Sequence, residues 1–261
     1  MNTRQRAIIL IILLLLLCHP AVSRAEMHPL LKNRAGVPPA DVLREILATQ
    51  QRHTYEIGMP GPDAAPFITW LADPDARIQP HHIISRPERK IFAVRSLGNQ
   101  ITSCLAAIDF GIRHLYSPVL LITGNTDSET LRLFSSGYAN LDLSIRQELN
   151  HLYPALVGIT TMEDNENREK ERRQVEENVD YQVEQAMGRY GDRVANGRLL
   201  VVGSVYDLTG TYGRGVGRLI IININGEKND AVIKKMELLR TIPPGLLTFI
   251  GRQPAKQDST E

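Results

Sequence analysis

Four short and almost continuously apolar runs constrain the fold of this chain more than any other feature. The runs are residues 67–71, 91–95, 119–123 and 199–205. Their strand length and their lack of polar alternation are typical of strands in a parallel sheet that is buried on both faces. Between the runs, apolar residues recur at helical spacing over 101–115 and 175–190. We therefore predict an α/β fold with a central, mostly parallel sheet flanked by helices.

The N-terminus has the pattern of a secretory signal peptide. Two arginines precede an apolar run over residues 7–17, and Ser23 and Ala25 supply small side chains around a cleavage point. The run is shorter than the roughly 20 apolar residues that span a bilayer. We expect cleavage after residue 25 and export to the periplasm or the medium. An uncleaved anchor, or lipidation at Cys18, is the alternative, and membrane contact is expected only through this segment.

The composition of the remaining chain argues against a nucleic-acid-binding protein and against a disulfide-stabilised one. Loss of residues 1–25 removes three of the 30 basic residues and none of the 29 acidic ones, which leaves a net charge of −2. Such a chain has no basic excess for a nucleic-acid backbone. One cysteine, Cys104, remains, so no internal disulfide is expected in an exported protein.

We divide the chain into a signal peptide and four further segments. These are an N-terminal segment (26–37), the main domain (38–226), a C-terminal extension (227–252) and a disordered tail (253–261). The length of the main domain is sufficient for one hydrophobic core.

Polar residues and glycines follow three of the predicted strands. They are Asp73, Asp75 and Arg77 after the first, Ser96, Gly98 and Asn99 after the second, and Gly124, Asn125 and Ser128 after the third. In open α/β sheets, ligands bind beyond the carboxyl ends of the strands. These residues are therefore the candidate lining of a polar pocket.

The same segments resemble those of β-class carbonic anhydrases in order and spacing. The matching segments are residues 73–77, 91–99, 124–129, 177–179 and 203–210. The resemblance extends over about residues 38–226 and implies the fold of that family. It also implies a homodimer, because members of the family are dimers or larger assemblies.

At the three zinc-ligand positions of the family, this chain has different residues. The family's first motif has a cysteine where this chain has Asp73, and its aspartate and arginine match Asp75 and Arg77. The third motif has a histidine and a cysteine where this chain has Asn125 and Ser128. Oxygen side chains of this kind suit Mg²⁺, Ca²⁺ or Mn²⁺ better than zinc. We expect no cofactor, with a hard divalent cation as the alternative to zinc.

Three functions remain open at this point. We favour a non-catalytic protein that binds a small anion such as bicarbonate, or a protein partner, with Asp75, Arg77 and the amides beyond Gly124 lining the remnant pocket. The second is a lyase or hydrolase that uses a hard cation, or Asp73 as a metal-free general base. The third is a structural role at the envelope, with docking through residues 163–190 or 236–250.

Two local predictions can be compared directly with a structure. Asp75 and Arg77 are expected to form a buried ion pair that braces the loop after the first strand. Thr126 and Glu129 have the spacing of a helix capping box, so residues 125–129 are expected to turn from a strand into a capped helix. Glu129 also replaces a glycine of the family motif and is expected to fill the old pocket.

Overall fold

The computed structural model describes residue 44 and residues 66–85, 87–160 and 167–252. The chain divides into two compact units, Met1–Thr54 and Tyr55–Glu261, and all described residues except Arg44 belong to the second. The predicted signal peptide, the N-terminal segment and the tail lie outside the described residues, so these predictions stay untested. In the described part of the chain, no helix has the length and apolar character needed to cross a membrane.

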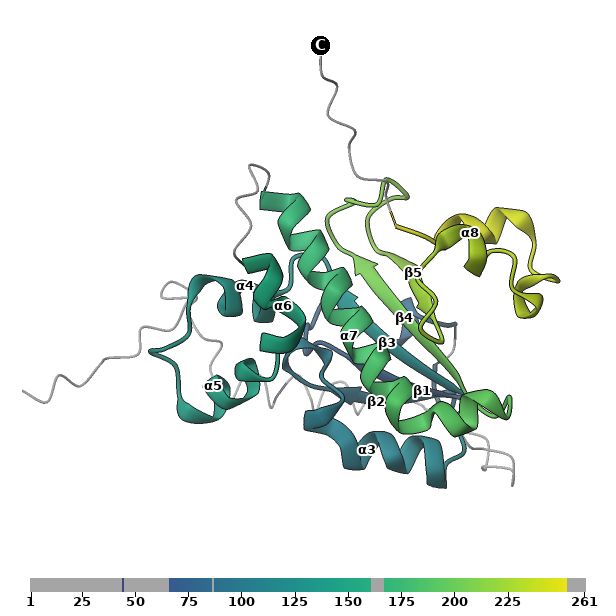
Figure 1. The fold of residues 1–261 in the computed structure, drawn as a ribbon, viewed down its shortest axis with the longest axis horizontal. Helices are drawn as coiled ribbons and strands as arrows, with labels where there is room; N and C mark the ends of the chain where they lie inside the picture. The colour runs from purple at the N-terminus through teal and green to yellow at the C-terminus, as the bar shows by residue number, and fades with distance from the viewer. Residues whose placement is uncertain (1–43, 45–65, 86, 161–166, 253–261) are drawn as a thin grey trace, which may run out of the picture. The chain divides into compact units, whose positions relative to one another are not determined.

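Five strands form one mixed sheet in the order β2-β1-β3-β4-β5 (Figure 1). The strands are β1 (Ile68–Ala72), β2 (Ile91–Arg95), β3 (Val119–Asn125), β4 (Leu200–Asp207) and β5 (Arg218–Ile224). The first four are parallel, and β5 runs antiparallel to β4. The predicted fold class is confirmed, because each apolar run is a strand whose ends lie within two residues of the predicted ends.

Helices lie in the connections from β2 to β3 and from β3 to β4, as the periodicity predicts. The α-helices are α3 (Leu105–Asp109), α4 (Glu129–Ser136), α5 (Leu143–Asn150), α6 (Tyr153–Thr160), α7 (Asn167–Ala195) and α8 (Asp230–Ile233). Short 3₁₀ turns are η1 (Pro80–His82), η2 (Leu97–Asn99), η3 (Thr102–Cys104), η5 (Glu237–Leu239) and η6 (Pro244–Phe249), and η4 (Phe110–His114) is a π turn. The predicted helix over 101–115 is therefore helical, but its geometry changes from 3₁₀ to α to π along its length.

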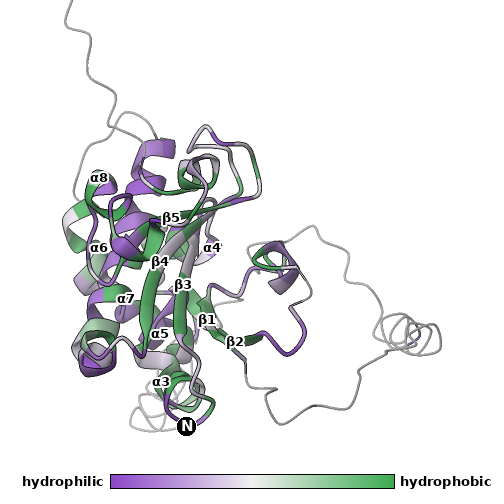
Figure 2. Cartoon of the chain, turned by 90° about the vertical axis from the view of Figure 1, so that its right-hand side faces the viewer, coloured by the Kyte–Doolittle hydropathy of each residue, from purple (hydrophilic) through white to green (hydrophobic). Residues whose placement is uncertain are grey.

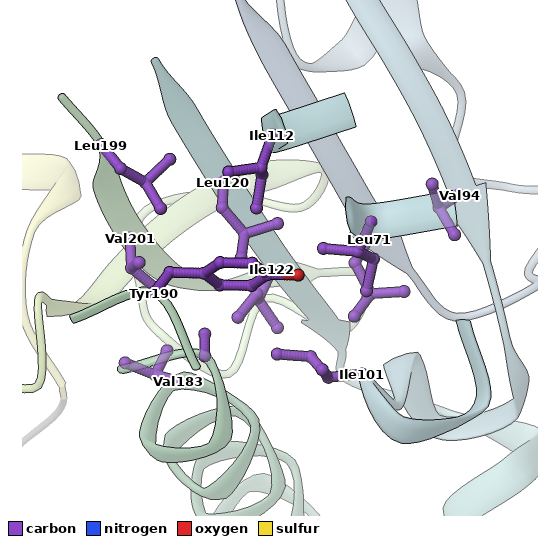
Figure 3. Close-up of a cluster of buried hydrophobic side chains, with 12 residues drawn as sticks. Leu71, Val94, Ile101, Ile112, Leu120, Ile122, Val183, Tyr190, Leu199 and Val201 are labelled. Carbon is purple, nitrogen blue, oxygen red and sulfur yellow. The ribbon is translucent and has the colours of Figure 1, made fainter. Parts of the chain in front are cut away.

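Side chains alternate between the two faces of the sheet. Leu71, Leu120 and Ile122 point to the face covered by α3 and α7, where they join one buried cluster with Tyr190 (Figure 3). Viewed from the side, α6 and α7 lie on one side of the strands (Figure 2). The alternate residues of the same strands, such as Trp70 of β1, point to the opposite face of the sheet. There they pack with residues of the β1–β2 connection, among them Ile78 and Ile83.

Helix α7 connects the sheet to the turn after β2. Its Asn178 donates from Nδ2 to the carbonyl of Gly98 at 2.9 Å, and Gln182 Oε1 accepts from the amide of Ile101 at 2.9 Å. Both amide side chains are buried. Buried polar groups are retained where they are hydrogen-bonded, so these two bonds fix η2 against the helix.

The C-terminal extension covers the edge of β5. Ile250 forms a parallel bridge with Ile221 of β5, and its side chain is buried with Ile224 and Ile233. Arg252 pairs with Asp180 of α7 at 2.7 Å. In this structure, residues 227–252 therefore protect a sheet edge that would otherwise have unpaired backbone groups.

Candidate functional site

Three strand ends bring the candidate residues together. In the register of the sheet, Ala72 of β1 lies beside Arg95 of β2 and Thr123 of β3, so these strands end at nearly the same level. Asp73 follows β1, the η2 turn follows β2, and Asn125 ends β3. The convergence expected from a parallel sheet is present, because residues far apart in sequence meet at this edge.

Asp73 is the centre of this arrangement. Its side chain is only 3% exposed and accepts three hydrogen bonds. Oδ1 accepts from the amide of Gly98 at 2.9 Å and from Thr130 Oγ1 at 2.8 Å, and Oδ2 accepts from Ser128 Oγ at 2.6 Å. We call Asp73, Gly98, Ser128 and Thr130 the Asp73 cluster. It connects the end of β1 to η2 and to the first turn of α4.

Burial raises the pKa of Asp73 above its ordinary value, because the charged carboxylate has lost its water. The hydrogen bonds from Ser128, Gly98 and Thr130 lower the pKa in turn, and the neighbouring charge of Asp75 raises it. The net direction is upward. A buried carboxylate with a raised pKa is a feature of functional sites, although structural networks produce it as well.

Asn125 lies beside a second carboxylate. Its Nδ2 donates to Asp75 Oδ2 at 3.3 Å and lies 3.4 Å from the carbonyl of Thr126. Its Oδ1 is buried and has no hydrogen-bond partner among the described residues. An unpaired buried carbonyl costs about 1–3 kcal/mol of stability. This oxygen is therefore the atom of the site that most needs a donor.

Arg77 joins two carboxylates at the rim of the site. Its Nε donates to Asp75 Oδ1 at 3.0 Å, and one terminal nitrogen donates to Asp75 Oδ2 at 2.6 Å. The other terminal nitrogen pairs with Asp127, which also pairs with Arg132. Hydrogen bonds from Arg77 lower the pKa of Asp75 and of Asp127. The ion pair is present as predicted, but it is not buried, because the Arg77 side chain is 47% exposed.

The helix start after β3 differs from the prediction in its capping. Ser128 is the N-cap of α4, and its Oγ accepts from the amide of Leu131 at 3.3 Å. Thr126 is not the cap: its Oγ1 donates to Asp207 Oδ1 at 3.2 Å and accepts from the amide of Leu208 at 2.7 Å. The predicted capping box is wrong, because the buried Asp207 carboxylate competes successfully for the Thr126 hydroxyl.

Glu129 does not fill the old pocket. Its side chain is 58% exposed and pairs with Arg132 one helical turn later. The first-turn position of Glu129 also places its charge near the positive end of α4, where the helix dipole stabilises a carboxylate.

The other predicted lining residues have local roles. Gly98 has a φ of +69°, and a Cβ there would lie 2.8 Å from Leu152, so glycine is required. Ser96 Oγ accepts from the amide of Gln100 at 2.7 Å. Asn99 Oδ1 accepts from Asn178 at 3.3 Å, while its Nδ2 is buried without a partner among the described residues. Gly124 lies against α7.

Two residues of the candidate site were not identified from the sequence. Thr130 supplies a hydroxyl to Asp73, and its position two residues after Ser128 is compatible with the same helical turn. Arg95 donates to the carbonyl of Asp73 at 2.8 Å, and its guanidinium lies 4.6 Å from the centre of the Trp70 ring. The burial that this stacking involves lowers the pKa of Arg95. Arg95 ends a predicted strand, so its place at the carboxyl edge of the sheet could have identified it.

The residues at this edge do not fit zinc. Zinc sites use thiolate, imidazole and carboxylate ligands, and a catalytic site needs three of them. Asn125 and Ser128 are neutral oxygen groups, and both oxygens of Asp73 already accept protein hydrogen bonds. Within residues 66–85, 87–160 and 167–252, no three His, Cys, Asp or Glu side chains are grouped as a metal site requires.

Comparisons with known proteins agree with this fold. The family model described as carbonic anhydrase matches residues 68–212. No curated protein sequence matches the chain.

Several solved β-carbonic anhydrases have similar structures. One from Sordaria macrospora, described as one of two tetrameric enzymes, is 18% identical, with a TM-score of 0.52 over 70% of this chain and 93% of its own. A Coccomyxa enzyme in complex with acetazolamide is 16% identical, with a TM-score of 0.53 over 80% and 91%. One from Aspergillus fumigatus is 20% identical, with a TM-score of 0.51 over 75% and 88%. At these identities, the likeness shows the fold alone.

Proposed function

The chain belongs to the carbonic anhydrase family, and we propose that it is a non-catalytic member in which hydrogen bonds replace the metal centre. One observation carries this proposal. Asp73 and Ser128, which stand where the family has two zinc-binding cysteines, bind each other at 2.6 Å. The side chains that would have to face a metal ion are thus engaged within the protein.

The chemistry of the family explains why this matters. Zinc supplies hydroxide at neutral pH because it lowers the pKa of bound water to about 7. Asp75 and Arg77 remain from the family's motif, but neither side chain can lower the pKa of a water molecule in this way. We therefore expect no hydration of carbon dioxide above the uncatalysed rate.

The geometry gives less support to the two enzymatic alternatives. A general base needs a raised pKa and access to its substrate. Asp73 has the first property, but both of its carboxylate oxygens are already occupied by hydrogen bonds from protein donors, which a substrate would have to displace. A hard cation needs about six oxygen ligands. Of the side-chain oxygens of Asp73, Asn125 and Ser128, only Asn125 Oδ1 makes no hydrogen bond to the described residues, so it alone is free to bind a cation.

The remnant site is better suited to a ligand that donates a hydrogen bond than to a bare anion. Asn125 Oδ1 is an acceptor without a partner, whereas the cations Arg77 and Arg132 are both paired with Asp127. Bicarbonate satisfies this requirement, because its hydroxyl can donate to Asn125 Oδ1. Asn125 is 1% exposed, so binding requires a local opening of the segments that cover it. We propose a small hydroxylated anion of this kind as the ligand of the remnant site.

Export and self-association are further parts of the proposal. The signal-peptide pattern of residues 1–25 supports a periplasmic or secreted location. Assembly as at least a homodimer is supported by the tetrameric relative from Sordaria macrospora. A protein partner at the envelope remains the second candidate for binding.

The decisive experiment measures metal content and activity together. Protein purified without a metal-binding tag would be analysed by inductively coupled plasma mass spectrometry and by stopped-flow hydration of carbon dioxide. We expect far less than one zinc per subunit and no turnover. Activity that scales with bound metal would overturn the proposal. Broadening of the ¹³C-bicarbonate NMR signal, reduced in Asn125→Leu, would test the ligand separately.

A further inference from the structure

A groove is lined by residues of α4, α5 and α6. These three helices lie at the left of Figure 1. Its volume is about 530 Å³, which is within the range of small-molecule sites. All three helices and the α4–α5 connection contribute to its lining. None of the residues of the Asp73 cluster lines it, so an inference about the groove does not depend on the function proposed above.

Three aromatic rings form a fixed wall of the groove. The ring of Phe134 stacks on that of Tyr138 with centroids 5.7 Å apart, and it meets the ring of Tyr153 edge-on at 5.6 Å. The Tyr138 hydroxyl donates to Asn150 Oδ1 at 2.8 Å, which holds that ring in place. Aromatic pairs in these geometries are favourable, so the wall exists before any ligand arrives.

Apolar surface in the groove remains open to solvent. The side chains of Leu143 and Tyr153 are 61% and 54% exposed, and Val157 is exposed beside them. Partial burial raises the pKa of Tyr138, and the neighbouring Tyr153 raises it as well. Exposed apolar surface that is concentrated in a concave site marks a place where another molecule binds.

Arg146 gives this apolar groove a single positive charge. Among the described residues that line the groove, it is the only cationic side chain, and none is a carboxylate. Its Nε is buried and has no hydrogen-bond partner among the described residues. A buried donor without a partner costs free energy, and a carboxylate is the planar acceptor that matches a guanidinium.

We propose that the groove binds a small molecule with one carboxylate on an aromatic body. The carboxylate would pair with Arg146, and the aromatic body would lie against Phe134, Tyr138 and Tyr153. One guanidinium balances one negative charge, so a monoanion suits the site better than a dianionic phosphate, whose second charge would have no partner. The groove volume of about 530 Å³ is of the size that a free small molecule occupies.

Isothermal titration of the full chain with 1-naphthoate tests this assignment. The neutral control is 1-naphthalenemethanol, which has the same ring system without the charge. We expect saturable binding of 1-naphthoate and about tenfold weaker binding of the alcohol, the ratio typical of a charged hydrogen bond. Arg146→Gln should weaken 1-naphthoate to the level of the alcohol, whereas Arg198→Gln, at an exposed turn outside the groove, should leave it unchanged.

Several results would overturn the proposal. They are equal affinity for the acid and the alcohol, unchanged affinity in a folded Arg146→Gln protein, or no saturable binding up to about 1 mM. Tighter binding of a phenylalanine-ending tripeptide with a free carboxyl group than of 1-naphthoate would assign the groove to peptides instead. Asp73→Asn should not alter 1-naphthoate binding, which separates this inference from the proposed function.

Discussion

Ser128 donates a 2.6 Å hydrogen bond to Asp73 across 55 residues of sequence, and this bond holds the start of α4 against the end of β1. Ser128 also caps α4, so one hydroxyl serves both the helix and the carboxylate. Thr130 and the amide of Gly98 complete the surroundings of Asp73. The carboxylate thus joins three segments, the end of β1, the turn after β2 and the first turn of α4.

Restoring the family's ligands should restore metal binding. The triple variant Asp73→Cys, Asn125→His and Ser128→Cys places two thiolates where Asp73 and Ser128 already meet, and an imidazole at the end of β3 beside them in sequence and register. We expect about one zinc per subunit, compared with far less in the natural protein, measured by mass spectrometry after dialysis. The double variant without Asn125→His is the matched control and should bind zinc more weakly. A folded triple variant without zinc would show that the backbone geometry of the site has been lost.

Asp73 should be important for stability. Asp73→Ala removes the acceptor of three hydrogen bonds and leaves the Gly98 amide and two hydroxyls without it, so we expect a loss of about 2–4 kcal/mol in the free energy of unfolding. Asp192→Ala, at an exposed position of α7, should change stability by less than about 0.5 kcal/mol. Urea denaturation followed by circular dichroism measures both, and equal losses would contradict a special role for Asp73.

The pH dependence of stability should reveal the buried carboxyl group. The pKa of Asp73 is raised in the folded state above its ordinary value of 3.8. At a pH between 3.8 and the folded-state pKa, the folded protein therefore binds more protons than the unfolded chain. The stability that Asp73 contributes is therefore complete below this window and falls as pH rises through it.

The comparison that isolates this effect is the stability of the natural protein minus that of Asp73→Asn. This difference should become more favourable to the natural protein as the pH is lowered from about 7 to about 4. Asp75 and Asp127 have lowered pKa values, so their contributions are lost on acidification, but both residues are present in the two proteins. The contribution of Asp127 cancels, and that of Asp75 cancels except for its charge interaction with Asp73. A difference that stays constant or decreases would exclude a raised pKa at Asp73.

Two glycines should respond to alanine in opposite directions. A Cβ on Gly124 would lie 2.8 Å from Val175 and 2.9 Å from Val179, so Gly124→Ala should cost about 1–3 kcal/mol through overpacking. Gly188 is exposed in α7 and has free space around its Cα, so Gly188→Ala should add about 0.5–1 kcal/mol. Thermal melting distinguishes the two, and equal effects would contradict the close packing of β3 on α7.

The candidate site was predictable to a different degree at each position. The strand ends were clear from apolar runs, and Asp73, Asn125 and Ser128 could be placed at one sheet edge from the parallel topology. The capping box was wrong, because Thr126 bonds to Asp207, a residue 81 positions later. The outward direction of Glu129 agrees with an i,i+3 pair with Arg132 on the same helix, which local spacing could have suggested. The exposure of Arg77 depends on Asp127, 50 residues away, which no local pattern specifies.

The amino-acid sequence by itself determined the α/β class and the residues that stand at the strand ends, because strand length, helical periodicity and parallel topology are properties of the pattern. Only the tertiary structure decided how those residues pair. Hydrogen bonds such as those from Ser128 and Thr130 to Asp73 depend on distances and directions between separate segments, and the low polarity around a buried carboxylate exists only once those segments have packed together.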